Sequence, residues 1–199
     1  MTKVTRKLKP LFIAFAVCAA TSHAGFAQQA GNLQDRADVE SGEVLDALFD
    51  DLANAEPQEA PIIERRIMRI WSLSGSAAVD LLVERGRDAL EEGDLAAAVE
   101  HLTAAIDHAP KYPLSYSLRA QAYYASGLMG PALQDLGTAL AREPRDFVAI
   151  MLLGGIQLEL NRLPEAHETF DRLGTIHPHF KDLTTIRERI GRVPGEFEL

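Results

Sequence analysis

The chain has 199 residues, of which 47% are hydrophobic and 25% charged, and its formal net charge is −9. This composition is typical of a folded domain with a packed core and excludes a largely disordered chain. Ala and Leu are abundant and only 7% of the residues are aromatic, which favours helices. The acidic balance argues against binding to nucleic-acid phosphates or to anionic lipid headgroups.

The N-terminal segment, positions 1–27, has the three parts of a secretory signal peptide. Four basic residues lie within the first nine positions, the apolar run LFIAFAVCAA follows, and small residues come next in TSHAGFAQQ. We expect cleavage after Ala24 or after Ala27, and therefore a periplasmic or secreted protein. The alternative is an uncleaved N-terminal anchor, but the apolar run is shorter than the ~20 residues that span a bilayer.

Removal of segment 1–27 changes the chemistry that is expected of the mature protein. It removes Cys18, the single cysteine, so neither disulfides nor thiolate chemistry are expected. It also removes four basic and no acidic residues, which leaves 16 basic against 29 acidic residues and a formal charge of −13. We therefore expect no nucleic-acid partner and, after cleavage, no membrane attachment.

Two regions precede the clearest pattern in the chain. Residues 28–42 are polar and are predicted to form a flexible leader. Residues 43–76 are predicted to form two amphipathic helices, with a break near Pro57. Their apolar stripes are Val44, Leu45, Leu48, Phe49 and Leu52 in the first helix, and Ile63, Ile67, Ile70 and Trp71 in the second.

Between positions 79 and 180 the sequence repeats with a fixed period. The three units are 79–112, 113–146 and 147–180, and each contains a Pro at the same place, namely Pro110, Pro144 and Pro178. Corresponding positions carry a large apolar residue, a tiny residue, an Ala and a bulky residue, in that order. These positions are Leu82, Tyr116 and Ile150; Gly86, Ala120 and Gly154; Ala98, Ala132 and Ala166; and Leu102, Leu136 and Phe170.

Each unit is predicted to be two amphipathic helices joined by a tight turn. Gly93, Gly127 and Asn161 stand at the midpoints, and all three tolerate the left-handed backbone that ends a helix. The tiny residue of the first helix lets the bulky residue of the second approach closely. The Pro then ends the second helix, because it lacks an N–H and disfavours helical geometry just before it.

The 34-residue period with this order of residues resembles the tetratricopeptide repeat. The resemblance covers about half of the chain and implies an all-α solenoid of helical hairpins, in which each pair buries its apolar face against a neighbour. It implies that residues 43–76 are a degenerate repeat capping the N-terminal end, and that 181–199 hold a capping helix and a tail. Arg85 and Arg119 depart from the Leu that usually precedes the tiny residue, and we expect them to soften packing there.

In tetratricopeptide-repeat proteins the first helices line a concave groove that holds a peptide or a partner helix, and the resemblance implies the same here. Each unit contributes three positions spaced i, i+4 and i+7, which share one helix face. The candidate partner-binding residues are Val83, Arg87, Leu90, Ser117, Gln121, Tyr124, Met151, Gly155 and Leu158. The groove is expected to be neutral to apolar, with Arg87 as its single cation. The alternative is that the protein's own leader or tail covers this face.

Some proteins of this family clamp the C-terminal carboxylate of a chaperone with several Lys and Asn residues in the groove. Val83, Arg87 and Leu118 stand at those places, so the resemblance does not carry that ligand over. An apolar or amphipathic segment with one acidic contact for Arg87 fits better.

Patterns of catalytic or metal-binding residues are weak. His177 and His179 have no third ligand nearby in the sequence, and residues 91–94 lack the ligand spacing of a calcium loop. Phosphate-binding loops and nucleophile elbows are missing. We therefore expect a non-catalytic protein–protein interaction module, an adaptor or scaffold, with no cofactor and no metal. The alternative is an accessory or structural subunit of an envelope enzyme or assembly complex, with the groove permanently filled; partner identity and oligomeric state stay open.

Overall fold

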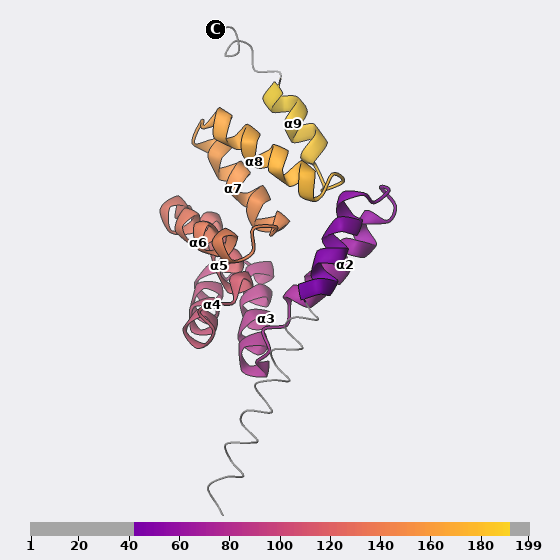
Figure 1. The fold of residues 1–199 in the computed structure, drawn as a ribbon. Coiled ribbons are helices and arrows are strands. Elements are labelled where there is room, and N and C mark those ends of the chain that lie inside the picture. The colour runs from indigo at the N-terminus through magenta and orange to yellow at the C-terminus, as the bar shows by residue number, and fades with distance from the viewer. Residues whose placement is uncertain (1–41, 192–199) are drawn as a thin grey trace, which may run out of the picture. The chain divides into compact units, whose positions relative to one another are not determined.

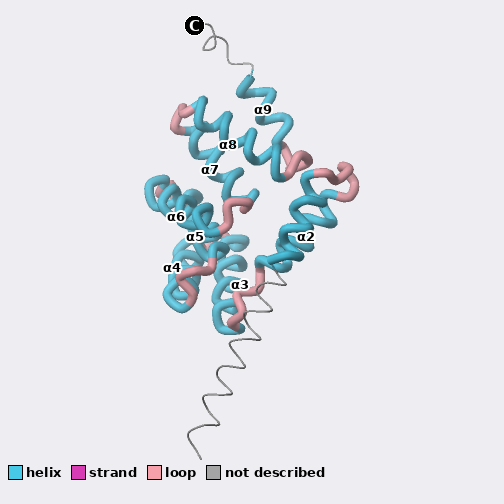
Figure 2. Tube along the Cα trace, viewed as in Figure 1, coloured by secondary structure: helices cyan, strands magenta, loops and turns pink. Residues whose placement is uncertain are grey.

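The computed structural model describes residues 42–191, and every regular element in this range is a helix (Figures 1 and 2). A helix over residues 42–53 comes first. It is followed by α2 (Ala60–Trp71), α3 (Ala77–Glu92), α4 (Leu95–His108), α5 (Pro113–Ala125), α6 (Met129–Arg142), α7 (Phe147–Glu159), α8 (Leu163–Ile176) and α9 (Leu183–Gly191). The expected signal peptide, the leader up to residue 41 and the tail after residue 191 lie outside the described residues. Among the helices described, none combines the length and apolar character needed to cross a bilayer.

The six helices α3 to α8 form three consecutive pairs, which coincide with the three 34-residue units. Within each pair the helices pack closely; α4 also packs on α5, and α6 packs less extensively on α7. The residues between the paired helices, Gly93, Gly127 and Asn161, have φ angles of 78°, 75° and 56°. The predicted left-handed turns are thus confirmed. Each second helix ends two residues before its Pro.

The tiny positions of the first and third pairs allow direct contact between helices. A Cβ atom placed on Gly86 would lie 2.6 Å from Leu102 Cγ, and one on Gly154 would lie 2.6 Å from Phe170 Cζ. Leu102 and Phe170 are almost completely buried. The predicted fit of a bulky side chain against a bare backbone is therefore confirmed, and it sets the spacing within each pair.

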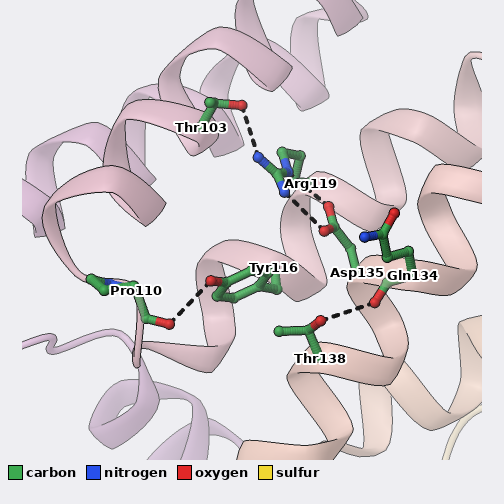
Figure 3. Close-up of polar contacts among 7 residues, drawn as sticks. All are labelled: Thr103, Pro110, Tyr116, Arg119, Gln134, Asp135 and Thr138. Atoms are coloured by element: carbon green, nitrogen blue, oxygen red, sulfur yellow. Dashed lines mark hydrogen bonds and ion pairs between the residues drawn. The ribbon is translucent and has the colours of Figure 1, made fainter.

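Arg119 links the first and second pairs instead of softening their packing. Its guanidinium donates to both carboxylate oxygens of Asp135 on α6, at 2.7 and 2.9 Å, and to Thr103 Oγ1 on α4 at 3.0 Å (Figure 3). The guanidinium carbon also lies 5.9 Å from the ring centre of Tyr116 and 5.6 Å from that of Tyr123. The expected loss of packing at this position is therefore wrong, because a bidentate ion pair replaces the apolar contact.

The N-terminal hairpin, residues 44–71, packs on the third helix pair. Leu48, Phe49, Leu52 and Ile67 share one buried core with residues of α7, α8 and α9. These contacts are made by side chains, since α2 has no extensive backbone contact with α3, α7 or α8 within the described chain. We expected the hairpin to cap the N-terminal end of the solenoid; in the structure its apolar side instead meets the aromatic start of α7. The capping helix α9 packs on the same core through Leu183, which is 1% exposed.

Candidate functional site

A cavity of about 610 Å³ lies where the first helices of the three pairs face α2. We call it the central cavity. Its walls come from α2, α3, α5 and α7, with Leu95 at the start of α4 and Asp146 just before α7. The lining residues are Met68, Trp71, Arg87, Leu90, Glu91, Leu95, Leu114, Ser117, Leu118, Gln121, Tyr124, Ala125, Asp146, Val148 and Leu152. The cavity opens to solvent, so a segment of another molecule can reach it.

The structure brings together five of the six groove residues that were expected in the first two units. Arg87, Leu90, Ser117, Gln121 and Tyr124 all line the central cavity. They come from α3 and α5, and equivalent positions on these two helices are 34 residues apart in the sequence. Their role in binding a partner stays a prediction.

The remaining expected groove residues lie elsewhere. Val83 is 3% exposed and packs between the first and second pairs. Met151 and Leu158 are partly buried against the core that α7 shares with the N-terminal hairpin and α9. Gly155 is not among the lining residues. The third pair therefore does not present the face that the sequence pattern predicted, because its neighbours occupy that side of α7.

Other residues complete the walls and were missed by the sequence analysis. Val148 and Leu152 line the cavity from α7, one repeat period after Leu114 and Leu118, which line it from α5. This shared register was a usable signal. Met68 and Trp71 on α2 lie outside the repeat, and the periodicity gave no indication of their position.

The electrostatics of the cavity depend on few groups. Arg87 is half-buried, and no carboxylate of the described residues lies within ion-pair distance of its guanidinium. Glu91 is exposed, whereas Asp146 is 4% exposed. The Tyr124 hydroxyl donates to Glu159, and this hydrogen bond, with some burial and the charge of Glu159, raises the pKa of Tyr124. The walls are otherwise apolar or neutral.

Comparison with known proteins relates these helix pairs to a family. Residues 83–135 match a family model described as "Tetratricopeptide repeat". Structures described as the first TPR of Spaghetti (RPAP3) bound to HSP90 peptide SRMEEVD and as the Arabidopsis OM64 TPR domain both superpose with a TM-score of 0.56 and 24% identity. Each superposition covers 59% of this chain. It covers 95% of the Spaghetti (RPAP3) chain and 97% of the OM64 chain. The helix pairs form a tetratricopeptide-repeat solenoid.

Two curated proteins, one from a bacterium and one from a plant, are similar to part of this chain. A TPR repeat-containing protein of Rhizobium etli is 34% identical over 113 residues, which are 56% of this chain and 55% of that protein. Hsp70-Hsp90 organizing protein 2 of Arabidopsis thaliana is 32% identical over 89 residues, or 45% of this chain and 16% of its own. The chain thus spans about half the length of the first relative and a smaller part of the second.

No metal-binding group is formed by the residues that the structure describes. No set of three or more His, Cys, Asp or Glu side chains converges within residues 42–191. Asp94, the last residue of the 91–94 segment, accepts a hydrogen bond from the Ala97 backbone N–H at 3.0 Å. Asp94 is therefore the N-cap of α4, which is an ordinary structural role for an Asp at this position.

Asp146 ties the second and third tetratricopeptide repeats together at the cavity wall. One carboxylate oxygen accepts from the backbone N–H groups of Val148 and Ala149, at 3.1 and 2.9 Å, and thereby caps α7. The other accepts from Ser117 Oγ at 2.5 Å. Burial raises the pKa of Asp146, and these hydrogen bonds only partly oppose the rise. Keeping the Asp146 carboxylate charged at this buried position therefore lowers the stability of the fold.

We expect Asp146→Asn to keep the stability of the protein at pH 7 or to raise it by up to about 1 kcal/mol, because Asn also caps helices and carries no charge. Because the folded protein binds the Asp146 proton more tightly than the unfolded chain, this group adds stability as the pH falls through its folded pKa toward its unfolded pKa. The wild type should therefore gain stability relative to Asp146→Asn between about pH 7 and pH 4. Urea unfolding of both proteins across this range measures the difference, with Asp94→Asn as the control at an exposed N-cap. A wild type that loses stability relative to Asp146→Asn on acidification contradicts the prediction.

Proposed function

We propose that this chain is a non-catalytic protein–protein interaction module whose central cavity holds an apolar segment of a partner protein. The observation that carries the proposal is the cavity itself. It measures about 610 Å³, within the range of ligand sites, and its mostly apolar walls carry one cation, Arg87, without an ion-pair partner among the residues described. An apolar surface of this kind near a cation suits a segment with large side chains and one acidic group.

The peptide held by one structural neighbour is a poor guide to the ligand here. That peptide, SRMEEVD, carries three acidic residues. The central cavity offers Arg87 alone against the carboxylates of Glu91 and Asp146. A strongly acidic segment would be repelled by this balance of charge, so an apolar segment with a single acidic residue is the better candidate.

We also propose that the protein works after export, in the periplasm. The basic, apolar and small-residue parts of segment 1–27 support this location. The module would then join or hold envelope proteins.

The function can be tested by selecting binders from a displayed peptide library. We expect the wild type to enrich apolar peptides with one acidic residue, and Arg87→Glu to weaken the selected peptide at least roughly tenfold, because a hydrogen bond to a charged group is lost and a repulsion is introduced. Titration calorimetry of wild type and variant measures the change.

Arg85→Glu provides the matched control. Arg85 lies on the same helix as Arg87, is exposed and does not line the central cavity, so the same change of charge should leave binding unaffected. Equal weakening by both variants would assign the effect to net charge and overturn the cavity as the site. A wild type that enriches no peptide would support a cavity that is permanently filled in a larger complex.

A further inference from the structure

The N-terminal hairpin meets the third repeat through a cluster of rings around Phe147. The ring centre of Phe147 lies 5.1 Å from that of Trp71 and 6.5 Å from that of Phe49, both on the hairpin. On the repeat side it lies 5.4 Å from His177 and 5.8 Å from Phe180. We call these five rings the aromatic seam. It joins segments that are far apart in the sequence, and it is part of the apolar core that holds α2 beside the central cavity.

The polar contacts across the seam are few. Asp46 pairs with Arg145 at 2.7 Å, but both side chains are substantially exposed, so the pair contributes little. His177 Nε2 lies 3.3 Å from a carboxylate oxygen of Glu64, and His179 Nε2 lies 3.1 Å from the backbone oxygen of Ala55. The hairpin is therefore held by ring packing, by the buried aliphatic side chains of Leu48, Leu52 and Ile67, and by a small number of polar contacts. One of these contacts is the hydrogen bond that the Tyr112 hydroxyl donates to the backbone oxygen of Trp71 at 2.5 Å.

Two buried polar atoms in the seam have no hydrogen-bond partner. They are the indole N–H of Trp71 and the Nδ1 atom of His177, and they account for two of the three such side-chain atoms in the part of the chain described. An unpaired buried polar group costs free energy, because it has given up water without replacement. Water would satisfy both atoms if the seam opened, so closure is opposed at this point.

His177 is the titratable group within the seam, and its side chain is 1% exposed. Glu64 on α2 and His179 in the loop after α8 are the titratable groups that act on it, while α7 presents the Phe147 ring. Burial lowers the pKa of His177, and Glu64 opposes this only in part. Protonation also turns Nδ1 into a buried donor that lacks an acceptor.

We propose that the N-terminal hairpin is an acid-released gate, which closes one side of the central cavity at neutral pH and leaves the third repeat when His177 takes up a proton. Since Met68 and Trp71 line the cavity from α2, release of the hairpin removes one wall and widens access to the repeats. The linker at residues 72–76 lies largely at the surface and contains Gly75 with φ of 81°. The Ser74 backbone N–H and hydroxyl donate to Asp80 on α3 at 2.8 and 2.5 Å, so the hairpin would pivot on the N-terminal side of Ser74. The gate does not depend on the identity of the partner.

Trp71 provides a direct readout, because it is the only tryptophan in the chain. In the full-length protein we expect the equilibrium constant for closure to fall roughly tenfold between about pH 7.5 and pH 5. Acrylamide quenching of Trp71 should increase over this range and its emission should shift to longer wavelength. Far-UV circular dichroism should stay constant, since the helices themselves remain folded.

Three variants assign the transition to one side chain. His177→Phe keeps an aromatic ring in the cluster and cannot be protonated, so it should keep Trp71 protected at both pH values. If this variant fails to fold, His177→Gln also lacks a group that is protonated in this pH range and should likewise keep Trp71 protected. His179→Gln, which changes the exposed neighbour, should retain the transition. The gate is overturned if the wild type protects Trp71 down to about pH 5, if the transition persists without His177, or if helicity is lost along with protection.

Discussion

Arg119→Met is expected to lower the free energy of unfolding by about 2–4 kcal/mol, the largest effect of any single change considered for this protein. The side chain of Asp135 is only 6% exposed, and it would lose both hydrogen bonds to the guanidinium. A carboxylate left in such a place has given up water and gained no partner, which is the costly way to break an ion pair. Urea unfolding at pH 7, followed by circular dichroism, measures the change.

Arg85→Met is the matched control, because Arg85 occupies the same position in the preceding repeat and is exposed. We expect its effect to stay within about 0.5 kcal/mol. The double change Arg119→Met with Asp135→Leu should recover much of the lost stability, since an apolar pair needs no hydrogen bonds. Equal effects of the Arg119 and Arg85 changes would show that the ion pair contributes nothing to the solenoid.

This pair of arginines also shows where the sequence pattern stops being informative. Periodicity placed Arg85 and Arg119 at equivalent sites, but their partners differ: the position opposite Arg119 holds Asp135, and the corresponding position in the first repeat holds His101. Whether a charged residue at a core position weakens packing or forms a buried ion pair depends on one residue on another helix. An alignment of the repeats does not by itself show which of these two outcomes a given arginine produces.

The helices, by contrast, were predictable because their limits depend on local chemistry. A residue able to adopt positive φ ends each first helix, and a Pro lies two residues beyond each second helix. These effects act within a few residues of the chain, so the printed sequence contains them completely. The same holds for the tiny and bulky positions, which recur at fixed spacing.

The central cavity was only partly predictable, because one of its walls comes from outside the repeat. The 34-residue register correctly brought Arg87, Gln121 and Tyr124 to one place. It could not place Trp71, whose position follows from its packing against Phe147, a ring that lies far along the chain. Long-range packing of this kind is set by shape and burial rather than by any local pattern.

Gly154→Ala should destabilise the third repeat by about 1–3 kcal/mol, although Ala is the better helix former. The added methyl group would lie 2.6 to 2.9 Å from three carbons of the Phe170 ring. Phe170 is 1% exposed and its ring is rigid, so the helices must move apart to admit the methyl group. Thermal and urea unfolding measure the loss.

The adjacent residue gives a control within the same turn of α7. Gly155→Ala meets no atom within 4 Å, so it should stabilise the protein by about 0.5–1 kcal/mol through its helix preference alone. Two identical chemical changes, one residue apart, are thus expected to have opposite signs. Combining Gly154→Ala with Phe170→Leu should recover part of the loss, because the smaller side chain makes room for the methyl group. If both glycine changes stabilise the protein, the close contact between α7 and α8 does not exist in solution, and the spacing of the third repeat must be wider than the structure has it.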